Sequence, residues 1–139
     1  MGPYFCIFEV CSGKCILRQH VFDGGYVRGI VQKNHQSIAI FGQKSLKIFN
    51  FLNLTTEVFI QCKDWILNVQ FLNNDLFVVG LAHNCIEIYE KSQLIKTIQG
   101  IPSCLLYSLS FFGNSLDTLL IASGPITKQI IIWDLNGNR

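Results

Sequence analysis

A strand pattern that recurs about every 40 residues constrains the fold of this chain more than any other feature. Four segments run through aliphatic residues into an aromatic residue, and these aromatic residues are Phe8, Phe49, Tyr89 and Trp133. They are spaced by 41, 40 and 44 residues. A glycine closes the apolar run before three of the segments, at Gly42, Gly80 and Gly124. A repeat of this length indicates stacked units of several strands each.

Nearly every apolar run has the length and composition of a β-strand. The runs hold β-branched and aromatic residues and are separated by clusters of Gly, Asn, Asp and Ser. In the two complete repeats we expect strands at 27–31, 37–41, 46–51, 58–62, 66–72, 76–81, 85–89 and 94–98. Further strands are expected at 4–10, 15–21, 106–112, 119–123 and 130–134. No window shows the 3.6-residue periodicity of an amphipathic helix, so the prediction is an all-β chain.

The composition narrows the classes of protein. Hydrophobic residues make up 50% of the 139 residues and charged residues 14%, against about 25% charged residues in a typical soluble domain. This balance excludes a disordered segment. The net charge of +2 argues against a nucleic-acid binder that depends on a strong general positive field. We therefore expect sheets that are covered on both faces.

Targeting signals and cysteine usage predict a cytosolic or nuclear protein. No apolar run approaches the roughly 18 residues of a membrane helix, and the start lacks the basic region of a secretory signal. The six cysteines show no CxxC pair, which favours reduced thiols over a disulfide framework.

A period of 40 to 45 residues with four strands per unit, ending in Trp133-Asp134, resembles the WD-repeat β-propeller. The resemblance implies a blade remnant at 1–25, blades at 26–62 and 63–100, and an incomplete blade at 101–139. That is a partial propeller of about three and a half four-stranded blades, whereas closed propellers typically have four to eight. We accordingly expect the chain to be part of a longer protein. The alternative is another small all-β fold whose strands are evenly spaced by coincidence.

The repeats depart from the full WD pattern. A complete repeat carries a Gly-His pair before its first strand and an Asp in the turn before its Trp strand, and neither of these is intact in any repeat here. Phe49 and Tyr89 replace Trp in the middle repeats. We therefore expect no Asp–His–Ser–Trp hydrogen-bond network, and blades that depend on apolar packing.

Four strings carry a closer resemblance, at 41–47, 64–66, 80–89 and 121–133. In order and spacing they are similar to the first blades of the WD repeat-containing protein 6 family. The motif residues concerned are Gly42, Lys44, Asp64, Trp65, Gly80, His83, Asn84, Gly124, Gln129 and Trp133.

That family resembles the non-catalytic partner of a tRNA 2′-O-ribose methyltransferase. The resemblance implies that this chain binds the catalytic subunit and helps to hold tRNA while the wobble nucleotide is methylated. S-adenosylmethionine would belong to the partner subunit, and no cofactor or metal is expected here. The alternative is a WD-repeat interaction module of another intracellular complex.

An enzyme is the less favoured interpretation. The sequence Asp23-Gly24-Gly25-Tyr26 matches neither GxGxxG nor a P-loop, and the histidines and cysteines show no paired zinc spacing. A Cys85–His83 nucleophile is conceivable, but Cys85 as a core residue and His83-Asn84 as a turn fit better. Asn84 would supply the positive φ of that turn.

Two further features bear on binding. Trp65 follows Asp64 where a repeat opens, and we favour a core position for its ring over a stacking surface. Four basic residues fall in the first full repeat, where they are candidates for phosphate contact with tRNA: Arg28, Lys33, Lys44 and Lys47. A solvated sheet edge is the alternative for these four.

Overall fold

The structure is a computed structural model, and it describes residues 4–22, 26–83, 85–99, 109–112, 120–123 and 131–134. The described residues form β-strands joined by turns, with no helix among them, which confirms the all-β prediction. The first sheet holds β1 (Tyr4–Phe8) and β2 (Cys15–His20). The second holds β3 (Gly29–Gln32), β4 (Ser37–Gly42), β5 (Ser45–Asn50) and β6 (Thr55–Gln61). The third holds β7 (Ile66–Phe71), β8 (Leu76–Leu81), β9 (Cys85–Glu90) and β10 (Gln93–Ile98). The fourth holds β11 (Leu109–Phe112), β12 (Leu120–Ser123) and β13 (Ile131–Asp134).

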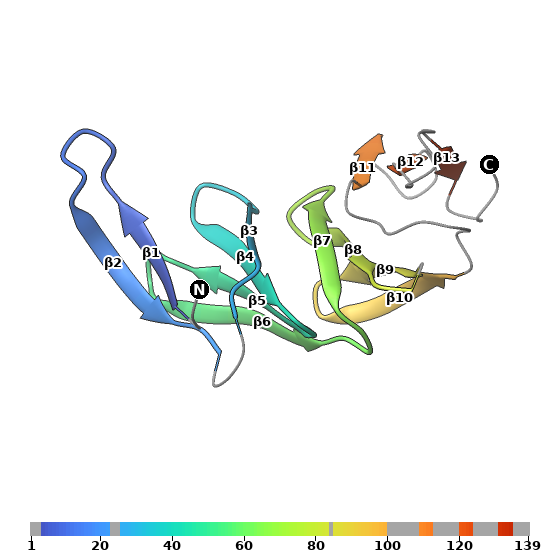
Figure 1. Cartoon of the computed structure of the whole chain (residues 1–139), viewed down its shortest axis with the longest axis horizontal. Helices are drawn as coiled ribbons and strands as arrows, with labels where there is room; N and C mark the ends of the chain where they lie inside the picture. The colour runs from blue at the N-terminus through green and yellow to red at the C-terminus, as the bar shows by residue number, and fades with distance from the viewer. Residues whose placement is uncertain are drawn as a thin grey trace.

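Each sheet is an antiparallel meander in which neighbours in sequence are neighbours in space. The four sheets follow one another in chain order (Figure 1). The first strand of the third sheet, β7, contacts β3 and β4 of the second sheet and β11 of the fourth. The first strands of successive sheets therefore lie side by side, as they do in a propeller-like arrangement.

Strand β4 shows why the charged fraction is so low. Its side chains alternate between two cores: Ala39 and Phe41 pack with the third sheet, while Ile40 packs with Phe5 and Val21 from the first. Both faces of this sheet are thus covered, and Ala39 and Ile40 have no exposed surface. In the third sheet, every residue of β8 is buried.

Three of the four aromatic residues that define the repeat, Phe8, Phe49 and Tyr89, share one structural detail. The register between the third and fourth strands of a sheet shifts at Ile48/Phe49 in β5, and between Ile7 and Phe8 in β1. In β9, the partners of Ile88 and Tyr89 skip one residue of β10. The shift marks a β-bulge, where two residues of one strand lie opposite a single residue of the neighbouring strand. Strands β1, β5 and β9 are therefore equivalent, and β1–β2 correspond to the last two strands of a four-stranded sheet.

Candidate functional site: an aromatic and basic loop end

Four loops meet at one end of the second and third sheets. They are the loop 26–28 before β3, the turn 43–44 between β4 and β5, the loop 62–65 between β6 and β7, and the turn 82–83 between β8 and β9. We call this the aromatic end. It holds a pocket of about 310 Å³ lined by Tyr26, Arg28, Gln43 and Trp65. The residues Tyr26 and Trp65 are 58% and 45% exposed, so our expectation that Trp65 belongs to the core was wrong.

The backbone holds these loops in place. At Gly42 an added Cβ would lie 1.6 Å from the Tyr26 carbonyl oxygen, which only glycine permits. The amide of Arg28 donates to Phe41, and the amide of Ile66 donates to Gln43 across the two sheets. The amide of Ala82 donates to the Trp65 carbonyl. Each wall of the pocket is thus fixed by a main-chain contact.

The two strand-joining turns of this end have the same conformation. Gln43 and His83 have φ of 51° and 61°, in the left-handed region. In the second turn the positive φ that the structure describes is that of His83. Asn84, to which our prediction assigned a positive φ, lies outside the described residues, so that assignment stays a prediction. In this conformation the His83 side chain turns outward and stays 87% exposed.

His83 pairs with Asp64 from the neighbouring loop. The imidazole Nδ1 hydrogen-bonds one carboxylate oxygen of Asp64, and the amide of Trp65 donates to the other at 2.8 Å. The hydrogen bond with His83, and then that from Trp65, hold the pKa of Asp64 below its usual value. The full WD repeat would have His before the first strand and Asp in the turn. Here the residue types are exchanged, and the structure shows a single Asp–His hydrogen bond rather than the four-residue Asp–His–Ser–Trp network.

The four predicted basic residues do not form one patch. Arg28 and Lys44 are exposed at the aromatic end. Lys33 lies at the opposite end of β3 and forms an ion pair of 3.1 Å with Glu57. Lys47 projects between the first two sheets, where its ammonium donates to the Val21 carbonyl and lies 5.9 Å and 5.6 Å from the ring centres of Phe22 and Phe59. Contact of these residues with tRNA stays a prediction, and the geometry favours Arg28 and Lys44 for it.

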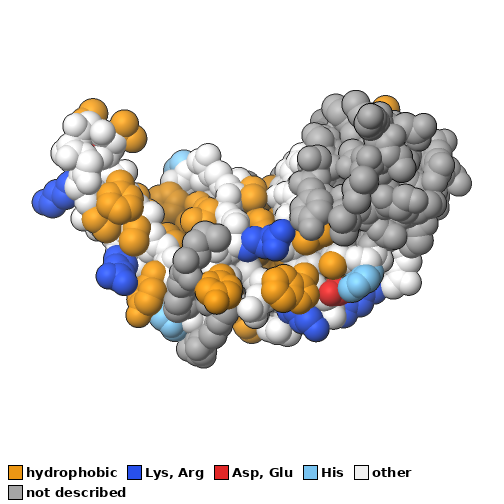
Figure 2. Space-filling model, in the orientation of Figure 1, with side chains coloured by type: hydrophobic (Ala, Val, Ile, Leu, Met, Phe, Trp, Pro, Cys, Tyr) orange, Lys and Arg blue, Asp and Glu red, His pale blue; other side chains and the backbone are white. Residues whose placement is uncertain are grey.

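Figure 2 shows hydrophobic and basic side chains at several places on the described part of the face turned to the viewer. Within the four loops of the aromatic end there are three cations, Arg28, Lys44 and Lys63, against the single acid Asp64. The sequence interpretation missed Tyr26 and Gln43. Both had a signal: Tyr26 is an aromatic residue directly after a Gly-Gly turn, and Gln43 follows the glycine that closes β4.

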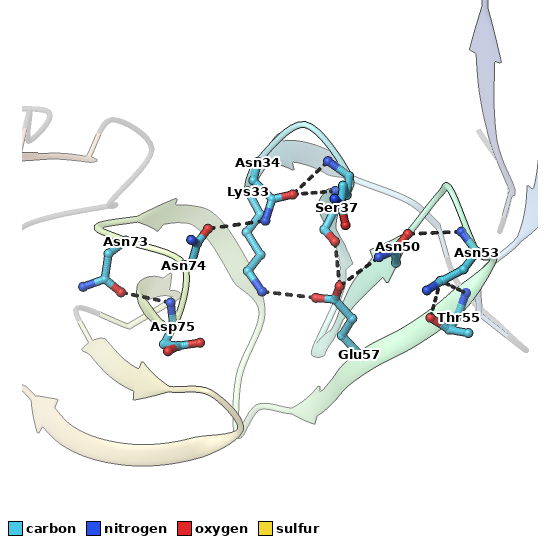
Figure 3. Close-up of polar contacts among 11 residues, drawn as sticks. Lys33, Asn34, Ser37, Asn50, Asn53, Thr55, Glu57, Asn73, Asn74 and Asp75 are labelled. Carbon is cyan, nitrogen blue, oxygen red and sulfur yellow. Dashed lines mark hydrogen bonds and ion pairs between the residues drawn. The ribbon is translucent and has the colours of Figure 1, made fainter.

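The opposite end of the same sheets, which we call the polar end, carries the turns 33–36, 51–54, 72–75 and 91–92. Figure 3 shows Glu57 at the centre of its contacts, accepting hydrogen bonds from Ser37 at 2.7 Å and Asn50 at 3.4 Å beside the Lys33 ion pair. Burial raises the pKa of Glu57. The hydrogen bonds from Ser37, Lys33 and Asn50 and the charge of Lys33 outweigh it, so the pKa lies below its usual value.

Among the cysteines that the structure describes, the two buried thiols, Cys62 and Cys85, give no sign of activation as nucleophiles. Burial raises the pKa of Cys62 to about 11 and also raises the pKa of Cys85. A catalytic thiol needs the opposite shift. The imidazole of His83, the base of the Cys85 alternative, hydrogen-bonds Asp64 instead. In the described ranges no three His, Cys, Asp or Glu residues gather in a metal-binding arrangement, and no helix there could span a membrane.

The remaining motif residues are placed as follows. Gly80 is buried in β8 and pairs with Ile86 of β9. Trp133 lies in β13 and pairs with Ile121 of β12. Gly124 and Gln129 lie outside the described residues.

The fold and the loop end define the class: an all-β chain of antiparallel sheets in a propeller-like arrangement, with an aromatic and basic surface at one end. Among solved structures, the crystal structure of the computationally designed Ika4 protein is similar, with a TM-score of 0.69 and 16% sequence identity. The match covers 96% of this chain and 80% of that chain, and it concerns the fold alone. No protein-family model and no curated protein matches the sequence.

Proposed function

We propose that the chain is a non-catalytic binding subunit whose aromatic end is its interaction surface. The observation that carries this proposal is the pocket of Tyr26, Arg28, Gln43 and Trp65, in which two large aromatic residues remain about half exposed on loops held by main-chain contacts. Exposed aromatic residues and arginine are the residue types that contribute most to binding at protein surfaces. Loops held by a rigid sheet scaffold are the usual carriers of such surfaces.

The four sheets are, in this proposal, successive WD-repeat blades, about three and a half in number. The position of the bulge in β1, β5 and β9 and the meander order of the sheets support this. The Asp64–His83 hydrogen bond supports it as well, because it joins the two loops that the Asp–His link of a WD repeat joins.

The complex that we propose is the one implied by the resemblance to the WD repeat-containing protein 6 family. The chain binds the catalytic subunit of a cytoplasmic tRNA 2′-O-ribose methyltransferase and helps to position tRNA, while S-adenosylmethionine binds to that catalytic subunit. The second candidate is a WD-repeat module of another intracellular complex. The exposed apolar residues of β1–β2 support it, since Phe8 and Ile16 are 58% and 60% exposed and could contact a protein partner of any kind.

Co-purification with the methyltransferase, followed by mass analysis of ribose methylation at the wobble nucleotide, tests the proposal. We expect the chain to bind the catalytic subunit and to raise methylation. Trp65→Ala should reduce the effect, whereas Leu52→Ala, which removes a 66% exposed side chain from the polar end, should not. A chain that neither binds the enzyme nor changes methylation would favour the second candidate.

A further inference from the structure

The aromatic end combines three features that bear on a ligand. Tyr26 and Trp65 leave ring surface in water, although burial of an aromatic side chain is favourable. The Arg28 side chain lines the same pocket, and no hydrogen bond or ion pair ties its guanidinium to another described residue. Gln43 adds an amide that can both donate and accept hydrogen bonds.

The size of the pocket limits the ligand. Small-molecule sites are usually about 300–1,000 Å³, and the pocket of about 310 Å³ lies at the lower end of that range. It suits one planar group between or against the two rings. A nucleobase has a flat π surface that stacks on tryptophan and tyrosine, whichever of the bases it is. Its edge groups can exchange hydrogen bonds with the amide of Gln43.

The charge of the surrounding loops selects the sign of the ligand. Arg28 lines the pocket, Lys44 follows Gln43 in its turn, and Lys63 lies in the loop of Trp65. The carboxylate of Asp64 already forms hydrogen bonds with His83 and with the Trp65 amide. A cationic ligand such as a methylated lysine or a basic peptide would be repelled, whereas a phosphate next to the stacked base would be attracted.

The pocket also distinguishes single from double strands. In a duplex the bases are stacked on each other, and their faces cannot reach a protein ring. The net charge of +2 provides little of the general attraction that holds a duplex through its phosphates. Stacking of an accessible base with one or two local phosphate contacts is the mode that fits both features.

We propose that the pocket of Tyr26, Arg28, Gln43 and Trp65 binds one unpaired base of a single-stranded RNA segment, with the adjacent phosphates on Arg28 and Lys44. This inference deepens the proposed function and rests on it for the choice of RNA. It assigns the RNA contact to the junction of the second and third sheets and excludes Lys33 and Lys47 from it.

The test is fluorescence anisotropy of a labelled single-stranded RNA of ten nucleotides, and of its duplex, with the 139-residue chain. Trp65→Ala should weaken single-strand binding about 5- to 150-fold, since one base–aromatic stack is worth about 1–3 kcal/mol, while Trp65→Phe should retain most of it. Arg28→Gln should lower the slope of log affinity against log salt by about 0.7, the loss of one phosphate contact to a single strand. Lys14→Gln, which removes an exposed cation from the β1–β2 hairpin, should leave the slope unchanged.

The outcomes distinguish failure of this inference from failure of the proposed function. If Trp65→Ala binds the single strand as tightly as the original chain, or if the duplex binds equally well, no base is stacked in the pocket. If Trp65→Ala loses only the methyltransferase, the pocket is a protein-docking surface. If the methyltransferase does not bind at all but RNA binding still depends on Trp65, the proposed function fails and the pocket assignment stands. Circular dichroism of each variant separates these results from misfolding.

Discussion

The two ends of the central sheets use their polar and aromatic residues in opposite ways. At the polar end the side chains bind each other: Asn34 accepts from the amides of Gln36 and Ser37 at 2.8 and 2.9 Å, and its own amide donates to Asn74 of the next sheet. At the aromatic end, Tyr26, Arg28 and Trp65 face solvent around a pocket. The same repeat therefore produces one end that closes on itself and one that is free to bind.

This difference between the polar end and the aromatic end indicates which of the two is available for binding. Hydrogen bonds that are fully made within the protein contribute to turn geometry and stability, and little is left for a ligand. Exposed rings and a cation without a partner among the described residues contribute little to folding. Substitutions at the polar end should consequently change stability without changing binding, and those in the pocket should do the reverse.

The largest effect is expected from Gly42→Ala, which should damage the aromatic end and the fold together. The new Cβ would meet the Tyr26 carbonyl oxygen at 1.6 Å, and a backbone atom cannot yield as a side chain can. We expect a loss of about 3 kcal/mol in the free energy of unfolding and loss of RNA binding. Urea unfolding and anisotropy measure the two effects.

The control is Gly13→Asn. Gly13 has φ of 69° with nothing within 4 Å of an added Cβ, and asparagine tolerates this conformation. Its stability should stay within about 0.5 kcal/mol of the original. A Gly42→Ala variant as stable as this control would show that loop 26–28 does not approach β4 closely.

The next effect is that of Glu57→Ala at the polar end. It removes the acceptor of the Ser37 hydroxyl, which is only 1% exposed, and the partner of Lys33. An unsatisfied buried hydroxyl and the lost bonds should cost about 2 kcal/mol, while RNA binding stays unchanged. Glu90→Ala, an exposed acid at the end of β9, is the matched control. A loss of RNA affinity with Glu57→Ala would contradict the separation of the two ends.

A smaller effect is expected from Lys47→Met, which tests whether Lys47 contributes to the fold or to phosphate contact. Methionine keeps the packing against Phe22 and Phe59 but cannot donate to the Val21 carbonyl. The free energy of unfolding should fall by about 1.5 kcal/mol, and the salt dependence of RNA binding should not change. Lys44→Met should do the opposite. If both variants lower the salt slope equally, Lys47 contacts phosphate after all.

The strand order could be predicted because each strand carries its own signal. The predicted run 76–81 has the same first and last residue as β8, because polar turns on both sides of the apolar stretch mark where the strand begins and ends. The bulges before Phe49 and Tyr89 could not be predicted, because a one-residue register shift depends on the partner strand. The spacing of the apolar runs therefore predicts the positions and order of the strands but not their register.

The candidate site was less predictable for a physical reason. Trp65 is apolar, and its place at the start of a repeat suits both a core and a surface position. Its exposure depends on how loop 62–65 meets the turn at Gln43 in another sheet. The four basic residues lie within 20 residues of sequence, but β3 carries Arg28 and Lys33 to opposite ends and β5 directs Lys47 inward. Contacts between sheets decide these positions, and no local pattern encodes them.

The smallest effect should come from Asp64→Asn, which tests whether the Asp64–His83 pair belongs to the fold or to the ligand site. Because the pKa of Asp64 is lowered in the folded chain, its charged form stabilises the fold at pH values above about 3.9, the pKa of an unfolded aspartate. This contribution disappears as the pH falls through the lower folded pKa. Urea midpoints at neutral pH should therefore fall slightly in the variant, by less than for Glu57→Ala, and the difference should vanish in strong acid.

RNA binding separates the two roles of this carboxylate. Asp64 is the one acid in the four loops of the aromatic end, so its neutralisation should strengthen RNA binding at low salt and have little effect at high salt, where exposed charges are screened. Asp75→Asn at the polar end should leave binding unchanged. A loss as large as that of Trp65→Ala would mean that Asp64 positions the Trp65 ring through the amide that it accepts from, which would make the Asp64–His83 pair part of the binding end.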